Sequence, residues 1–204
     1  MRVDKVILKA FLSTLAAILL LFAFMFGVLA AAFPSTMMYL SYDFGRDKSS
    51  IRYAERAYKW FEDTSYMAHA MEVAIGIDDQ EKIEQCGLIV VEDEAYFTQY
   101  CAEKDAILSE KVDIGYAQYI HGKIAVAKYE QSKKEDAVQY AFDSLQGEFP
   151  QSNAVVSLMY TAHSAGDQET KDLIKGKMEQ QNTDGLDETA KAYFDKTCAL
   201  LASN

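Results

Sequence analysis

The chain has 204 residues, with 20 Lys and Arg against 31 Asp and Glu, a net charge of −11, and 50% hydrophobic residues. This length excludes two large domains, and only 2 Pro and 10 Gly exclude a collagen-like or linker-rich chain. The negative charge argues against a general nucleic-acid-binding protein, which needs a basic surface. The 13 Tyr and 11 Phe exclude an intrinsically disordered chain.

The first expected element is a membrane-spanning helix that follows a short basic tail, residues 1–9. No charged residue occurs between Lys9 and Asp43, and the core of this apolar stretch begins at Ala10 and ends at Phe33. About 20 apolar residues in a helix span the roughly 30 Å hydrocarbon core of a bilayer. We therefore expect a single transmembrane signal anchor with the lipid bilayer as its partner, in preference to a buried core helix.

A cleaved secretory signal peptide is the alternative, because the small residues between Ala30 and Ala32 offer a cleavage site. The apolar run is longer than the roughly 7–15 residues of a signal peptide, which favours an uncleaved anchor. The basic tail favours an N-terminus in the cytoplasm and a C-terminal domain outside it. Positive charge discriminates weakly between the two sides, since Arg46, Lys48 and Arg52 follow the apolar stretch.

Residues 34–46 are expected to form an interfacial linker. Pro34 stops or kinks the preceding helix, and Tyr39, Tyr42 and Phe44 follow it. Amphipathic rings favour the headgroup zone of a membrane, so these residues fit an aromatic belt. The same rings could instead pack on the soluble domain, and the sequence leaves both interpretations open.

Residues 47–204 are predicted to form an acidic, all-α soluble domain. From residue 43 onward the chain holds 17 basic and 30 acidic residues, a net charge of −13. The apolar pattern is helical throughout, and we interpret the closest strand candidate, from Gly87 to Val91, as buried helix. Capping and turn signals predict helices over 50–63, 65–77, 79–91, 94–107, 111–131, 133–148, 152–165, 168–182 and 185–202.

Two of these helix starts carry a capping-box pattern, in which a side-chain acceptor is followed three residues later by Glu. Asp78 with Glu81 is one, and Ser132 with Glu135 is the other. We therefore expect Asp78 and Ser132 to be N-cap residues.

The turns predicted in the second half of the chain are regularly spaced. The turn predicted at Ser132 recurs at Gly166, and the turn predicted at Pro150 recurs at Asp184, with the same offset along the chain in both cases. This offset gives a period of about 34 residues, which is typical of helical hairpins that stack into an array.

Over about residues 115–182 the chain resembles tetratricopeptide repeats. Ala125 and Ala137 stand where that family has small residues at helix contacts, Pro150 stands at the end of a repeat, and Gly166 matches the turn between two helices. The resemblance implies stacked helix pairs that bind another polypeptide. Another kind of helical-hairpin domain is the alternative.

The cysteine and histidine residues predict no metal site and no cofactor. The three His are scattered, and Cys86, Cys101 and Cys198 contain no Cys-x-x-Cys pair. Small buried thiols are the default expectation, although Cys86 and Cys101 could pair as a disulfide outside the cytoplasm. No phosphate-binding loop and no hydrolase motif is present.

An acidic cluster, Glu92, Asp93 and Glu94, is the best candidate for enzyme chemistry. Paired carboxylates cleave glycosidic bonds when one is held protonated and the other ionised. We favour the simpler interpretation that these charges lie at a helix N-terminus.

The remaining candidate is a recognition surface on the exposed sides of two predicted helices. Exposed rings give contact area at low entropic cost, and amide and imidazole groups hydrogen-bond a bound backbone. Ordinary packing between helices is the alternative. The candidate partner-binding residues are Tyr119, Tyr129, Asn153, Tyr160 and His163.

The first functional hypothesis is a non-enzymatic, single-pass membrane protein that acts as a scaffold for another membrane or envelope protein at the bacterial cell envelope. The second is a membrane-tethered hydrolase of a cell-wall polymer that uses Glu92 and Glu94. The third is a cytoplasm-facing accessory subunit of a membrane complex. No nucleic acid and no metal is expected as a partner.

Overall fold

The computed structural model of the chain describes residues 2–108, 115–145, 149 and 153–202, and every regular element among them is a helix. The helices are α1 (Arg2–Ala32), α2 (Pro34–Asp43), α3 (Asp47–Phe61), α4 (Thr64–Gly76), α5 (Gln80–Glu92), α6 (Glu94–Leu108), α7 (Tyr116–Glu130), α8 (Lys134–Asp143), α9 (Ala154–Ser164), α10 (Gln168–Met178) and α11 (Glu188–Ala202). The all-α prediction is confirmed. Gly87 and Val91 lie in helix α5, so the helical interpretation of that segment is confirmed too. The turn predicted at Pro150 and the helix starts predicted at 111 and 152 lie outside the described residues.

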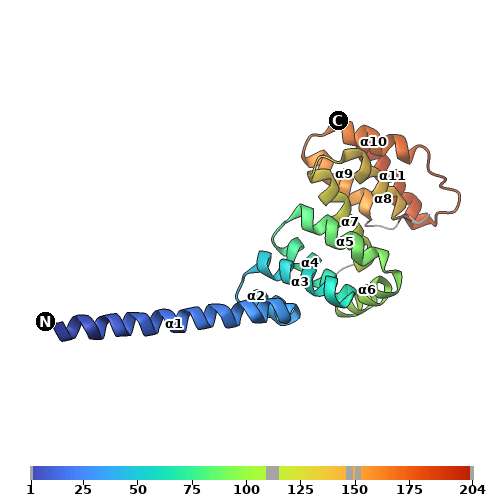
Figure 1. Ribbon diagram of the computed structural model, residues 1–204. Coiled ribbons are helices and arrows are strands. Elements are labelled where there is room, and N and C mark those ends of the chain that lie inside the picture. Colours follow the sequence, from blue (N-terminus) through green and yellow to red (C-terminus); the bar gives the residue numbers. More distant parts are fainter. Residues whose placement is uncertain (1, 109–114, 146–148, 150–152, 203–204) are drawn as a thin grey trace.

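Helix α1 projects from the rest of the molecule as a single rod (Figure 1). Its segment Val6–Ala32 has 27 residues, is long and apolar enough to cross a membrane, and is not buried against any other part of the protein. The other helices pack into one elongated array at the end of this rod (Figure 1).

The chain breaks between α1 and α2 at Phe33, whose φ of −135° and ψ of 64° lie outside the helical region. Pro34 has no N–H, so it cannot donate the helical hydrogen bond to the carbonyl oxygen of Ala30. Arg56 of α3 donates to this oxygen instead, over 3.1 Å from its Nη1. The α2–α3 pair is thereby fastened to the C-terminal end of the rod.

The expected linker, residues 34–46, is largely helix α2, and its inner side packs on α3 and α4. Met38 is buried in the core of the array. Tyr39 and Tyr42 are 59% and 52% exposed, although both rings lie edge-on against His69. These two rings therefore contact the helical domain and still present half of their surface to the surroundings.

One turn geometry joins four helix pairs in the described part of the chain: α2–α3, α4–α5, α7–α8 and α9–α10. In each turn a left-handed residue donates its N–H to the carbonyl three residues back, and the next residue donates to the carbonyl five residues back. The left-handed residues are Gly45, Asp78, Ser132 and Gly166, with φ between 58° and 67°. The spacing from Gly45 to Asp78 nearly equals that from Ser132 to Gly166, so the recurrence extends beyond the part of the chain in which the sequence shows it.

Two of the predicted N-cap residues are wrong, because they are the left-handed residues of these turns. Asp78 and Ser132 are left-handed turn residues, and α5 begins one residue later with Asp79 as the N-cap. The last helix also begins later than predicted, because Asp187, not Asp184, accepts the capping N–H. A left-handed turn needs only one strained residue, and polar side chains tolerate it well enough to replace glycine.

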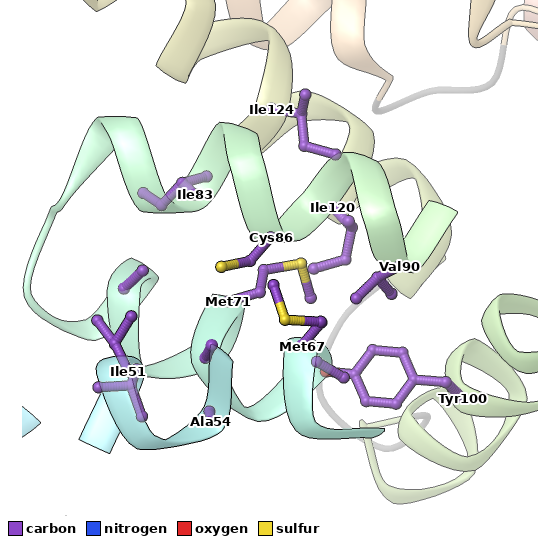
Figure 2. Close-up of a cluster of buried hydrophobic side chains, with 14 of the residues drawn as sticks. Ile51, Ala54, Met67, Met71, Ile83, Cys86, Val90, Tyr100, Ile120 and Ile124 are labelled. Carbon is purple, nitrogen blue, oxygen red and sulfur yellow. The ribbon is translucent and has the colours of Figure 1, made fainter. Parts of the chain in front are cut away.

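Helix α7 lies between two hydrophobic cores. Its Ile120 and Ile124 belong to the first core together with Met71 of α4 (Figure 2), whereas its Ala125 belongs to the second core with Leu158 of α9. Helix α5 packs directly on α7, so α6 lies beside the array rather than within it. Because α6 and its connections lie between them in the chain, Asp78 and Ser132 are farther apart in sequence than the turn residues within each half of the array.

A buried carboxylate ties the first half of the array to the second. Glu84 of α5 is 7% exposed and accepts from Lys128 Nζ at 2.9 Å, from Lys133 Nζ at 2.6 Å and from Gln131 Nε2 at 2.7 Å. Burial by itself would raise the pKa of Glu84, but the hydrogen bonds from Lys133, Lys128 and Gln131 outweigh it and hold this pKa below its usual value.

Candidate functional site

The four equivalent turns place four helices, α2, α4, α7 and α9, in a common register. Six residues before each left-handed residue stand Tyr39, Glu72, Val126 and Tyr160, and none of them is buried. Helical periodicity puts positions nine and thirteen residues before the turn on the same side. We call this side of α2, α4, α7 and α9 the first-helix face.

Aromatic side chains stand on the α7 and α9 part of the first-helix face. Tyr119 is 38% exposed and Tyr160 is 50% exposed, and the ammonium group of Lys123 lies 5.5 Å from the centre of the Tyr119 ring. The two helices approach closely because Gly122 has no side chain: a Cβ there would lie 2.8 Å from Ser157 Oγ. The structure therefore brings Tyr119 and Tyr160 onto adjacent helices, as the candidate surface requires.

Two of the five candidate residues serve the fold. Asn153 is fully buried, and its Oδ1 accepts from the N–H of Val156 at 2.9 Å, so it is the N-cap of α9. Its expected place on an exposed surface is wrong. Tyr129 is half-buried, and its hydroxyl donates a hydrogen bond to Asp167 Oδ2 over 3.1 Å. This bond links α7 to the start of α10. His163 remains exposed near the end of α9.

The α4 part of the first-helix face is occupied by a cluster around Glu72 that the sequence did not reveal. The Glu72 carboxylate accepts from the Tyr100 hydroxyl at 2.5 Å and pairs with Lys104, both of α6. The Tyr116 ring of α7 lies edge-on against Tyr100, with 5.6 Å between centroids, and Tyr119 follows it at 5.6 Å. Helix α6 is thus held against α4 and α7.

These contacts change the protonation of the Glu72 cluster. Burial would raise the pKa of Glu72, but the hydrogen bonds from Lys104 and Tyr100 lower it below its usual value. Burial raises the pKa of Tyr116 to about 12. The carboxylate is therefore ionised and the phenol neutral at physiological pH, so Glu72 accepts a hydrogen bond from Tyr100 and forms an ion pair with Lys104.

A serine–histidine contact near the Glu72 cluster is not arranged as a catalytic pair. The Ser50 hydroxyl lies 3.0 Å from His69 Nε2, but it donates its proton to the carbonyl oxygen of Met38 at 3.0 Å. Ser50 is also fully buried, so no substrate reaches it. Burial lowers the pKa of His69, with Glu72 opposing it. The imidazole thus contacts both helices of the α2–α3 pair.

The acidic cluster is divided between a cap and two solvent-facing side chains. Asp93 accepts from the N–H of Tyr96 at 3.2 Å and from the Thr64 hydroxyl at 2.6 Å, so it caps α6. Glu92 and Glu94 are exposed. This arrangement agrees with the interpretation of the cluster as a helix start.

The thiols are unpaired. Cys86 and Cys101 are buried free cysteines, so the alternative of a disulfide between them is not realised, and Cys198 is half-buried and free. Burial raises the pKa of both Cys86 and Cys101 to about 12, which makes them poor nucleophiles. Within the described residues, no group of three or more His, Cys, Asp or Glu side chains is placed to hold a metal ion.

Sequence reasoning missed Glu72, Tyr100 and Lys104. Tyr100 follows Glu72 by 28 residues, and no local pattern marks such a contact. The sequence showed the turns at Ser132 and Gly166 but not the equivalent turns at Gly45 and Asp78, although glycine occupies one turn of each pair.

Comparison with models of protein families, with curated proteins and with solved structures finds no match to this chain.

Proposed function

We propose that this protein is a non-enzymatic, single-pass membrane protein of the bacterial cell envelope, whose helical array is a scaffold that binds another membrane or envelope protein. Helix α1 is the anchor. Its apolar segment Val6–Ala32 is not buried against the array, and an exposed apolar surface of this size is stable only when lipid or another protein covers it.

The array itself is proposed to be of the tetratricopeptide-like kind. The support is the turn geometry that Ser132 and Gly166 share, and the direct packing of α7 on α9 and of α8 on α9 and α10. Stacked hairpins of this kind expose one side of successive helices as a continuous surface.

One observation carries the proposed binding role: Tyr119 and Tyr160, 38% and 50% exposed, stand on adjacent helices of the first-helix face. Interfaces are enriched in tyrosine because its ring buries a large area at low entropic cost. Residues 62–204 hold 12 basic and 27 acidic residues, a net charge of −15. We therefore propose a partner segment with apolar or aromatic anchors and basic flanks.

Site-specific photocrosslinking in native membranes tests this binding role. A photoreactive amino acid replaces Tyr160 in one full-length variant and Glu135 in a control variant; Glu135 is exposed on α8, a second helix of a pair. We expect one discrete crosslinked product from position 160, none from position 135, and loss of the product when Tyr119→Ala is added. Equal products from both positions would contradict a specific surface.

An activity assay on the purified full-length protein distinguishes a scaffold from a hydrolase. We expect no turnover of cell-wall polysaccharide by the full-length protein. Turnover that disappears in Glu92→Gln or Glu94→Gln would replace the scaffold proposal with the hydrolase alternative.

We further propose that the array lies outside the cytoplasm, with the N-terminal tail inside. The test uses Gln168→Cys, an exposed position on α10, together with Cys198→Ser; Cys86 and Cys101 are buried and remain as an unreactive background. An impermeant maleimide is expected to label this variant in intact cells. Labelling only after permeabilisation would support the cytoplasm-facing alternative.

A further inference from the structure

The charges of the array are divided between two regions. Residues 33–61, which form α2, α3 and their turn, carry five basic and three acidic residues, a net charge of +2. Residues 62–204 carry a net charge of −15. The helix pair closest to α1 in the chain is therefore the basic part of an otherwise acidic domain.

The basic residues of α3 form a stripe. Lys48, Arg52, Arg56 and Lys59 are separated by four, four and three residues, so they lie on one side of the helix. All four are exposed. We call these four residues the α3 basic stripe.

The α3 basic stripe is left without carboxylate partners in the described part of the chain. The ion pairs found there use other cations, namely Lys82, Lys104, Lys128, Lys133 and Lys134. Arg52 makes only local contacts of 3.3 Å, with the carbonyl of Lys48 and the hydroxyl of Ser49. Exposed, unneutralised cations attract anions from outside the chain.

The hydrogen bond from Arg56 to the Ala30 carbonyl places the stripe beside the C-terminal end of α1, the proposed membrane anchor. A helix rises 1.5 Å per residue, so about 20 residues cross the roughly 30 Å of hydrocarbon. Counted from Lys9, the last charge before the apolar stretch, this length ends at Leu29. Ala30 then lies at the hydrocarbon boundary, and Arg56 lies at the level of the lipid headgroups.

Helix α3 also has a hollow of about 300 Å³, lined by Ser49, Arg52, Tyr53 and Arg56. The lining residues are thus two arginines, a serine and a tyrosine. Arginine binds phosphate through paired N–H donors, and a hydroxyl adds a further donor. The hollow therefore has the chemistry of a phosphate headgroup site.

We propose that the α3 basic stripe binds the phosphate groups of anionic phospholipids in the leaflet at the C-terminal end of α1, and so holds the first helix pair against the membrane surface. This inference rests on the proposed membrane anchoring by α1. It goes beyond anchoring because it assigns a lipid class and a binding surface to α3.

Electron paramagnetic resonance of spin-labelled lipids tests both statements in the full-length protein. The chain is reconstituted in phosphatidylcholine vesicles with a trace of spin-labelled phosphatidylglycerol or phosphatidylcholine, at low ionic strength. A membrane-spanning helix gives a motionally restricted spectral component, and the ratio of this component for the two labels measures the preference for anionic lipid. We expect a preference of about fivefold in the natural chain.

The test variant is Arg52→Gln with Lys59→Gln, and Arg56 is kept because it bonds to Ala30. The matched control is Lys175→Gln with Lys191→Gln, two exposed lysines on α10 and α11. We expect the preference to fall to about twofold in the test variant, with the remainder due to Lys48, Arg56 and the basic tail, and to stay at about fivefold in the control. High salt should remove most of the preference in all chains.

The outcomes separate the two proposals. A restricted component with the same lipid preference in the natural chain and both variants would overturn the lipid-binding inference and leave the anchor intact. No restricted component with either label would overturn the anchor itself, and the lipid inference with it. Circular dichroism of each variant checks that its helix content equals that of the natural chain.

Discussion

The α2–α3 pair shares its turn geometry with three helix pairs of the remainder, α4–α11. The two regions differ in what their charged side chains contact. In the remainder, lysines reach across between helix pairs: Lys128 and Lys133 bond to Glu84, and Lys134 pairs with Asp167. On α3, Arg52 and Lys59 face solvent without a described carboxylate partner. The lysines of the remainder therefore link helix pairs to one another, whereas the cations of α3 are part of the exposed surface.

This difference indicates how helix pairs that share one turn geometry can differ in what their cations contact. A partly buried ion pair fixes the position of two helix pairs, since both groups lose much of their hydration and must keep their partners. An exposed unpaired cation adds little to stability and remains available to an external anion.

Glu84→Ala is expected to have the largest effect. It removes the acceptor shared by Lys128 and Lys133 and leaves cations without a partner between α5 and α7, so we expect a loss of about 3 kcal/mol in the free energy of unfolding. Thermal unfolding of the detergent-solubilised full chain, followed by circular dichroism, measures it. The control is Glu55→Ala, which breaks the more exposed pair with Lys82 and should cost less than about 1 kcal/mol. Equal losses would contradict the role of Glu84 as an internal tie.

Gly87→Ala is expected to cost about 2 kcal/mol, although alanine favours helix formation. A Cβ at this position would lie 2.7 Å from Cγ1 of Ile124, a fully buried side chain that cannot move aside. Gly176→Ala is the matched control, because nothing lies within 4 Å of the added atom. The control should be stabilised by about 0.5–1 kcal/mol. Unfolding measurements that gave both changes the same sign would contradict close packing of α5 on α7.

Acid is expected to weaken the contacts of Asp167 with Lys134, Thr170 and Tyr129. The pKa of Asp167 is lowered from 3.8 to about 2; its burial opposes this, but the hydrogen bonds from Lys134, Thr170 and Tyr129 prevail. Because the unfolded chain binds more protons in this range, stability from Asp167 is present above about pH 4 and is lost as the pH falls toward 2. We expect a contribution of about 1 kcal/mol.

Asp167→Asn tests the source of this pH dependence. This variant should be less stable than the natural chain at pH 7 and should lose less stability between pH 4 and pH 2, measured as unfolding temperature against pH. Parallel curves for the two chains would assign the acid sensitivity to other groups, with Glu84 as the next candidate because its pKa is lowered as well.

Arg52→Gln with Lys59→Gln is expected to have the smallest effect on stability, below about 0.5 kcal/mol, because neither side chain has a described carboxylate partner. The same unfolding measurement checks it. A loss comparable to that of Glu84→Ala would show that the α3 basic stripe is an internal tie, and the contrast between the two regions would disappear.

The predicted exposure of the candidate residues was only partly correct, for physical reasons that individual residues make clear. Tyr160 was predicted to be exposed from the apolar stripe on the other side of its helix, and it is. Asn153 was placed by the same periodicity, but it stands one residue before the helix, where a side chain folds back as a cap. Tyr129 has the right periodicity, and a carboxylate 38 residues away binds it.

The sequence alone determined the features that depend on neighbouring residues along the chain. The apolar rod, the helical character of every described element and the excess of acid follow from composition and from the periodicity of about 3.6 residues. Tertiary structure alone decided which lysines became ties, that α6 lies beside the array, and that four turns are equivalent. Those outcomes depend on contacts such as Lys133 with Glu84, 49 residues apart, and local propensity carries no information about groups that meet only when helices pack.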